Sequence, residues 1–260
     1  TRQIEKKNID MEQVDAYLPD FTIQMNSGQQ NTVARFLKAR NIGFRHLTVT
    51  TSVREESGFR FTTRIDAPYY AGVRLDSVSL TTWQRDRSLA YAFNVDGSAN
   101  EQKGPFHVNV TGNMLGNHLR TELKQKDGQG EVGFNLGIGV TLEDSVVSAS
   151  FFPITPILGY RRWIVNPDNK VVIREGGKID ANLRFAYADK LISIQSLGDE
   201  GNQKERLKVE IKGVDLAALT RLLPFSPDLA GQLNTDLLLY SLDDALAVNG
   251  EIAVNEFYYQ

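Results

Sequence analysis

Alternation of apolar and polar residues is the pattern that most constrains this chain. It recurs in the segments FRFTTRIDA from Phe59, LAYAFNVD from Leu89, VGFNLGIGVTL from Val132, IDANLRFAY from Ile179 and LKVEI from Leu207. Successive side chains of a β-strand point to opposite faces of a sheet, so this period predicts strands with one dry face and one wet face. We expect about a dozen antiparallel strands and an all-β fold.

Clusters of Gly, Asn, Asp and Pro separate the alternating segments. Examples are Asp96-Gly97-Ser98, Lys126-Asp127-Gly128 and Asn166-Pro167-Asp168-Asn169. Such residues supply the backbone angles that tight turns need, and their spacing is typical of a meander. No linker or repeat divides the chain. We therefore expect one continuous β segment over residues 1–260, with a candidate seam near residues 152–156.

Two segments have helical periodicity. Residues 29–40 (QQNTVARFLKAR) place apolar side chains such as Phe36 on one side and basic side chains in solvent. Residues 215–223 (DLAALTRLL) begin at Asp215, a good capping residue, and stop before Pro224. Both segments are short and amphipathic, so we expect two short helices that lie on a sheet.

Composition excludes several classes of protein. The formal net charge of −3 argues against a nucleic-acid partner, which usually requires a basic excess. The chain has no Cys, which excludes thiol catalysis and Cys-ligated zinc. No apolar run reaches the roughly 18 residues of a membrane-spanning helix. The chain opens without an initiator Met, and we expect it to be a piece of a longer polypeptide.

No constellation of catalytic residues stands out. The histidines, His46, His107 and His118, lack metal-ligand spacing. Adjacent carboxylates fall at expected strand ends, where neighbouring side chains point to opposite faces; they are Glu55-Glu56, Glu143-Asp144, Asp199-Glu200 and Asp243-Asp244. A nucleophile elbow and a P-loop are both missing. We therefore expect no enzymatic activity, no catalytic residue, no metal site and no cofactor.

The glycine pair Gly137 and Gly139 needs a separate explanation. It lacks the third glycine and the following helix of a dinucleotide-binding fingerprint. Glycine inside a strand often marks a place where another group approaches closely. The pair therefore predicts a strand whose wet face is kept small.

The C-terminal segment carries a family resemblance. From Val209 it reads VEIKGVDLAALTRLLPFSPDLAGQLNTDLLLYSLDDALAVNGEIAVNEFYY, which orders a strand, a short helix, Leu-Pro, Ala-Gly and further strands. This order resembles the AsmA-like and TamB-like proteins of Gram-negative envelopes. Residues 158–173 (LGYRRWIVNPDNKVVI) are similar to the TamB-like translocation and assembly modules of the Bacteroidetes. We expect an internal or partial fragment of such a protein, with its most specific unit at residues 207–260.

The resemblance implies an extended antiparallel sheet curled into a taco-like groove with an apolar concave side. Proteins of this family span the periplasm, act as conduits for phospholipid and help to assemble outer-membrane proteins. It follows that this chain would be periplasmic, with its parent anchored in the inner membrane. Its partners would be phospholipid acyl chains and, through other parts of the parent, an outer-membrane barrel. Nucleic acid is not expected, and exposed edge strands would allow self-association.

The apolar alternate positions would line such a groove. They are Phe59, Phe61, Ile65, Leu89, Tyr91, Phe93, Phe134, Leu136, Ile138, Leu183, Phe185, Leu237 and Leu239. The same residues would form an ordinary core if the chain were a closed β-sandwich, such as an adhesion or carbohydrate-binding module of a secreted protein. The two hypotheses differ in whether the apolar faces meet each other or stay open.

Overall fold

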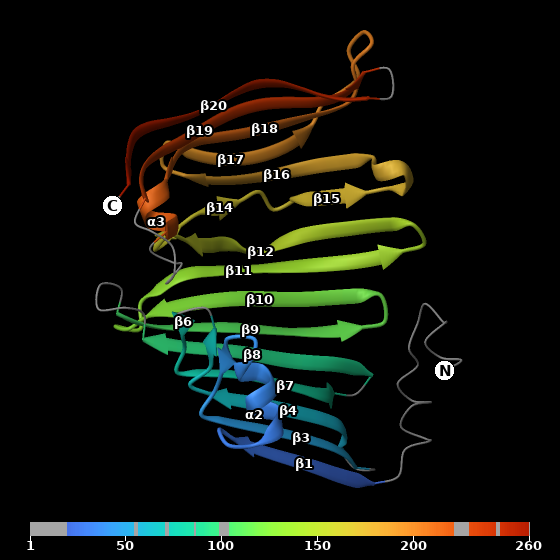
Figure 1. The fold of residues 1–260 in the computed structure, drawn as a ribbon. Helices are drawn as coiled ribbons and strands as arrows, with labels where there is room; N and C mark the ends of the chain where they lie inside the picture. The colour runs from blue at the N-terminus through green and yellow to red at the C-terminus, as the bar shows by residue number, and fades with distance from the viewer. Residues whose placement is uncertain are drawn as a thin grey trace. The chain divides into compact units, whose positions relative to one another are not determined.

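The described part of the chain folds almost entirely into antiparallel β-structure and includes two short α-helices (Figure 1). The structure is a computed structural model that describes residues 20–54, 57–70, 73–85, 87–98, 104–220, 229–242 and 245–259. The carboxylate pairs at 55–56 and 243–244 and the expected helix end at 221–223 lie outside these residues. The prediction of an all-β fold is confirmed. The chain divides after Glu131 into two compact units, each described by itself below.

The main sheet of the first unit has the strand order β1-β3-β4-β7-β8-β9-β10, and every neighbouring pair is antiparallel. These strands are β1 Phe21–Gly28, β3 His46–Arg54, β4 Gly58–Asp66, β7 Ser77–Arg85, β8 Ser88–Ser98, β9 Pro105–Leu115 and β10 His118–Asp127. Helix α2 (Thr32–Lys38) follows β1. A second small sheet joins β2 (Ile42–Gly43), β5 (Tyr69–Tyr70) and β6 (Val73–Arg74).

The second unit is also a meander. It contains β11 Val132–Glu143, β12 Val146–Leu158, β13 Arg161–Arg162, β14 Ile164–Val165, β15 Lys170–Ile173, β16 Ile179–Tyr187, β17 Lys190–Ser196, β18 Lys204–Asp215, β19 Leu229–Leu242 and β20 Ala245–Tyr259. Strand β12 pairs with β11, β13 and β15, and β16 pairs with both β14 and β15. From β16 onward each strand pairs with the next, so that β20 is the outermost strand of this unit.

Register shifts bend the long strands of the second unit. Strand β18 has shifts between Lys204 and Leu207 and between Ile211 and Val214 where it pairs with β19. An extra residue in one strand of a pair increases the local twist and bends that strand. Figure 1 shows β19 and β20 curving along their length. These bends give the expected curled sheet.

Both helices begin at a polar capping residue. The side chain of Asn31 accepts a hydrogen bond from the Ala34 amide at 2.9 Å, and that of Asp215 accepts one from the Ala217 amide at 2.9 Å. Helix α2 is shorter than the segment predicted, and the prediction that Phe36 lies on its buried side is wrong. The Phe36 side chain is 57 % exposed, and the Arg40 guanidinium lies 3.8 Å above its ring. Neither of the described helices is long and apolar enough to cross a membrane.

The second unit contains a packed hydrophobic core. Its buried members come from β14, β16, β18 and the residue before β14, and they are Trp163, Val165, Leu183, Phe185 and Val214. The Trp163 indole donates a hydrogen bond to the Leu158 carbonyl at 3.1 Å, as a buried indole N–H requires. Leu219 of helix α3 (Leu216–Thr220) packs against this core. The helix therefore covers one part of the apolar side of the sheet.

Candidate functional site

Cross-strand register gathers apolar side chains on one face of the first unit's sheet, which we call the first apolar face. One row across all its strands consists of Met25, Val49, Thr63, Leu80, Phe93, Val110 and Leu123. The adjacent row consists of Ser27, Leu47, Ile65, Val78, Val95, Val108 and Gln125. Directly opposed side chains in such pairs contact each other. The rows therefore form a nearly continuous apolar surface that runs across the strands.

The row from Met25 to Leu123 remains open to solvent, whereas Ser27 and Gln125 at the ends of the adjacent row are buried. Met25 is 43 % exposed and Leu123 37 %, and the five residues between them in their row are half-buried. A side chain in a closed core is almost inaccessible to water and is packed on all sides. Contact with neighbours in the same sheet accounts for partial burial, but no residue of this row is sealed. This surface is the first candidate binding surface of the first unit.

The opposite face of the same sheet is polar. Asn109 donates a hydrogen bond to the Asn94 side chain at 2.7 Å, and Arg64 pairs with Asp66 at 2.8 Å. Asn94 in turn lies 3.5 Å from the Ser79 hydroxyl. These side chains satisfy one another in water and form no apolar patch. The lopsided character predicted from the alternation is thus present in three dimensions.

Three residues of the polar face resemble a catalytic triad in composition but not in geometry. The Asp96 carboxylate accepts a hydrogen bond from the Ser77 hydroxyl at 2.8 Å and lies 2.5 Å from Nδ1 of His107. In a hydrolase triad the serine would donate to the imidazole, which takes its proton. Here both side chains contact the carboxylate, so His107 does not activate Ser77. The cluster acts as a cross-strand hydrogen-bond network.

The sheet of the second unit also has an apolar face, which is buried around Leu183 and partly exposed around Leu237. Across β16–β19 one row runs Leu183, Ile194, Val209 and Leu237. Leu183 is 5 % exposed and belongs to the core, whereas Leu237 is half-buried. Leu183 belongs to the buried cluster that contains Trp163 and Val165 and against which Leu219 packs, whereas Leu237 does not belong to this cluster.

The predicted groove residues divide between the two units. In the first unit, register places Phe59, Phe61, Ile65, Leu89, Tyr91 and Phe93 on the first apolar face. In the second unit the predicted residues are Phe134, Leu136, Ile138, Leu183, Phe185, Leu237 and Leu239. Only Leu183 and Phe185 are buried, and the other eleven are half-buried.

Sequence reasoning missed important members of the first apolar face. Val49 lies in HLTVTTSVR and Leu80 in SVSLTTWQR, where threonines blur the alternation. Their place in the row follows from pairing with Thr63. The local pattern shows which residues of one strand share a face. Only the pairing register shows that Val49 and Leu80 both lie beside Thr63.

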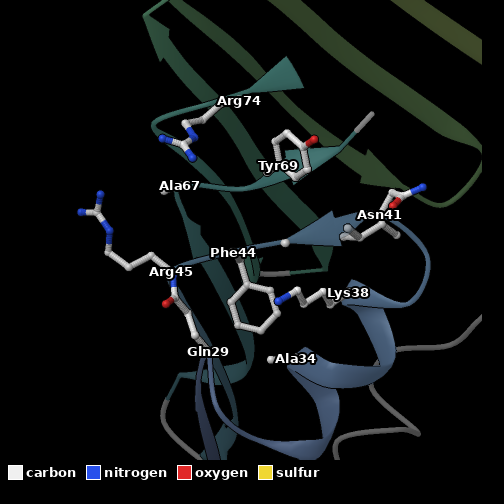
Figure 2. Close-up of a pocket in the computed structure, with 11 residues that line it drawn as sticks. Gln29, Ala34, Lys38, Asn41, Phe44, Arg45, Ala67, Tyr69 and Arg74 are labelled. Atoms are coloured by element: carbon white, nitrogen blue, oxygen red, sulfur yellow. The ribbon is translucent and has the colours of Figure 1, made fainter. Parts of the chain in front are cut away.

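A pocket of about 650 Å³ is the second candidate site of the first unit (Figure 2). Helix α2, the small sheet and the chain entering β3 surround it. Three of its lining residues are basic, namely Lys38, Arg45 and Arg74, and none of the described lining residues is a carboxylate. Figure 2 shows Lys38 approaching from the helix and Arg74 from strand β6, on the other side of the pocket. We call this site the basic pocket.

The charge of the basic pocket is not compensated by the part of the chain that the structure describes. None of its three basic side chains has an ion pair with a described residue. In the second unit, by contrast, Lys212 lies 2.6 Å from Glu210 and Lys208 lies 3.3 Å from Asp236. The sequence does contain a signal for a basic site, because residues 21–54 include five Lys or Arg and no Asp or Glu.

Comparisons with known proteins assign no family. No family model, curated protein or solved structure matches this chain. Among the described residues, no group of three or more His, Asp or Glu side chains is placed to hold a metal ion. The open apolar faces and the basic pocket are the features that bear on function.

Proposed function

We propose that this chain is a segment of a periplasm-spanning envelope protein of the TamB-like or AsmA-like type, and that its open apolar faces carry or shield lipid acyl chains. The parent protein would be anchored in the inner membrane. It would move phospholipid between the membranes, assist outer-membrane protein assembly through an outer-membrane barrel, or do both. The observation that carries the proposal is the row from Met25 to Leu123, which is apolar except at Thr63 and contains no buried residue.

Hydrocarbon is the ligand that such a surface favours. Each methylene that leaves water for an apolar surface contributes about 0.8 kcal/mol. An exposed apolar surface that extends across a whole sheet is uncommon in soluble proteins without a binding role. A row of aliphatic and aromatic side chains with few polar groups offers no directional bonds. An acyl chain could therefore shift along it without crossing large barriers.

The first experiment asks whether lipid is present on the protein. The chain is purified without detergent, extracted with organic solvent, and the extract is analysed by mass spectrometry. We expect phospholipid to co-purify in amounts comparable to the protein. An extract free of lipid, combined with no binding of added short-chain phospholipid, would contradict the proposal and favour an adhesion or carbohydrate-binding module.

The second experiment tests the face itself with a matched pair of variants. Leu80 and Thr81 are neighbours on the central strand β7 and point to opposite faces. Leu80→Asn places an amide in the middle of the apolar row, and we expect it to weaken binding of dioctanoyl phosphatidylcholine about fivefold, as loss of about 1 kcal/mol of apolar contact implies. Thr81→Asn serves as the control and should leave the affinity unchanged. Equal effects of the two variants would show that the apolar face is not the binding surface.

A further inference from the structure

We infer that the basic pocket binds the phosphoryl group of an anionic ligand whose hydrocarbon part lies on the first apolar face. The hydrocarbon half of this inference rests on the proposed function. The phosphoryl half rests on the pocket itself, whose described lining includes Lys38, Arg45 and Arg74 and no carboxylate.

The pocket has the size and chemistry of a site for a charged head group. Ligand pockets in proteins typically have volumes of about 300–1,000 Å³, and the 650 Å³ of this one is within that range. Arg binds phosphate oxygens through its planar fork of donors, and Lys binds them as a compact charge. Asn41 and Gln29 add neutral polar groups to the same lining. Phe44, which is buried, forms an apolar wall.

A bound anion would stabilise these unpaired cations more than it would stabilise cations that already have a carboxylate partner. Lys38 and Arg74 lie on two sides of the pocket, whereas the Arg45 side chain extends away from them (Figure 2). Like charges at one cavity repel each other, and no described carboxylate forms an ion pair with any of the three. Lys38 also lies in the last turn of helix α2, where a positive charge is favourable to the helix. The helix therefore helps to hold the Lys38 ammonium beside the pocket, although Lys38 has no ion pair with a described residue.

The pocket lies at one end of the first apolar face. Ser27 belongs to the second row of that face, and its hydroxyl accepts a hydrogen bond at 2.6 Å from Asn31, the cap of helix α2. Leu75 directly follows β6, and its side chain also reaches the first apolar face. Its Cδ2 atom lies 3.2 Å from the position that a Cβ atom on Gly97 of β8 would occupy. The elements that form the pocket thus begin on the apolar face. A ligand with a phosphoryl head and acyl tails could contact both.

Short-chain lipids that differ only in the head group separate the two halves of the inference. The full chain is titrated with dioctanoyl phosphatidylglycerol, with dioctanoylglycerol, which lacks the phosphate, and with inorganic phosphate. The pocket variant is the double substitution Lys38→Gln with Arg74→Gln. The control variant, Arg60→Gln with Lys124→Gln, removes the same charge from the polar face of the same sheet. Thermal unfolding of each variant verifies that it is folded.

We expect the wild-type chain to bind phosphatidylglycerol at least about tenfold more tightly than dioctanoylglycerol, as charge-assisted hydrogen bonds imply. The pocket variant should lose this difference while still binding dioctanoylglycerol, and the control variant should keep it. Competition by inorganic phosphate for phosphatidylglycerol would further support a phosphoryl site.

Different failures identify different errors. If the preference for phosphatidylglycerol is absent from the wild type or survives in the pocket variant, the inference is overturned, yet dioctanoylglycerol binding would still support the proposed function. If neither lipid binds but inorganic phosphate binds and is lost in the pocket variant, the ligand is a free phosphate compound. That result would overturn the lipid part of the inference together with the proposed function.

Discussion

The ring of Phe152 lies over Gly137 on the neighbouring strand, in the space that a Cβ atom on Gly137 would occupy. The two residues are direct partners in the β11–β12 pair, on the face opposite Ile138 and Phe151. The sequence predicts that this strand carries small residues on its wet face. The reason at Gly137 is that the Phe152 ring occupies the space of a side chain. Gly139, the other member of the glycine pair, faces only the Ser150 hydroxyl.

The glycine pair provides a matched test of this packing. We expect Gly137→Ala to lower the free energy of unfolding by about 1–3 kcal/mol, the usual cost of overpacking, because the Phe152 ring must move. At Gly139 an added Cβ would lie 3.5 Å from the Ser150 hydroxyl, an ordinary contact, so Gly139→Ala should be neutral or slightly stabilising. Urea denaturation measures both. If Phe152→Leu does not relieve the cost of Gly137→Ala, the ring is not its source.

The difference between sealed and open apolar surface can be measured with one type of substitution. Leu183 and Leu237 lie in the same cross-strand row, but only Leu183 is buried. We expect Leu183→Ala to cost about 3 kcal/mol, because it leaves a cavity in a packed core. Leu237→Ala should cost less than about half of that, since its neighbourhood is open to water. Equal losses in denaturation experiments would mean that the β19 part of the face is covered.

Acid should weaken the network around Asp96. Burial by itself would raise the pKa of Asp96, but hydrogen bonds from His107 and Ser77 and the charges of His107 and Arg64 outweigh it and lower the pKa below its usual 3.8. The folded carboxyl therefore holds its proton less tightly than the unfolded one. Its stabilising contribution is complete above the unfolded pKa and is lost as the pH falls through the folded value.

The measurement for this network is melting temperature against pH for the wild type and Asp96→Asn. We expect the wild type to be the more stable at pH 6, and the difference to shrink as the pH falls below the usual carboxyl pKa of 3.8. Glu131→Gln, an exposed substitution in the same unit, should show no such convergence. A constant difference across the whole range would show that the Asp96 charge does not stabilise the fold.

The exposed apolar residues of the outer strand β20 lead us to expect self-association. Of its residues only Ala247 is half-buried and all the others are exposed, including Leu246 at 76 % and Ile252 at 67 %. It carries neither Lys nor Pro, the residues that commonly protect edge strands. If residues 245–255 of β20 pair with the same residues of a second copy about Gly250, Glu251 would face Asn249 and no two carboxylates within that range would be opposed. The apolar side chains of the two strands would then share one face.

Sedimentation velocity at increasing protein concentration tests this pairing. We expect the wild type to dimerise and Ile252→Lys to remain monomeric, because a lysine on an edge strand opposes the approach of another strand. Ile23→Lys places the same charge on β1, the outer strand of the first unit's sheet, and should not affect dimerisation. A wild type that stays monomeric at all concentrations would refute the pairing. Loss of dimerisation in both variants would indicate that β20 pairs with β1 of another copy.

Much of the fold could be predicted from local sequence. The alternation from Phe59 and from Leu89 identifies strands and assigns each side chain to a face, because a strand's period of two is a property of its own backbone. The position of Asp215 before LAALT predicts a helix cap, and its side chain does cap α3. Phe36 was misplaced because helical spacing shows which residues share a side, but not whether a sheet lies against that side.

The tertiary structure alone decided which faces are sealed and where charges meet. Leu183 and Leu237 have the same local pattern, yet only Leu183 is buried, because it joins the core cluster of Trp163 and Val165 against which Leu219 packs. Nothing in the sequence aligns Glu210, Asp236 and Glu251 in one row, or Lys38 with Arg74 across a pocket. Burial and charge neighbourhood depend on pairing between residues far apart in the chain, and that pairing is set by the free energy of the whole sheet.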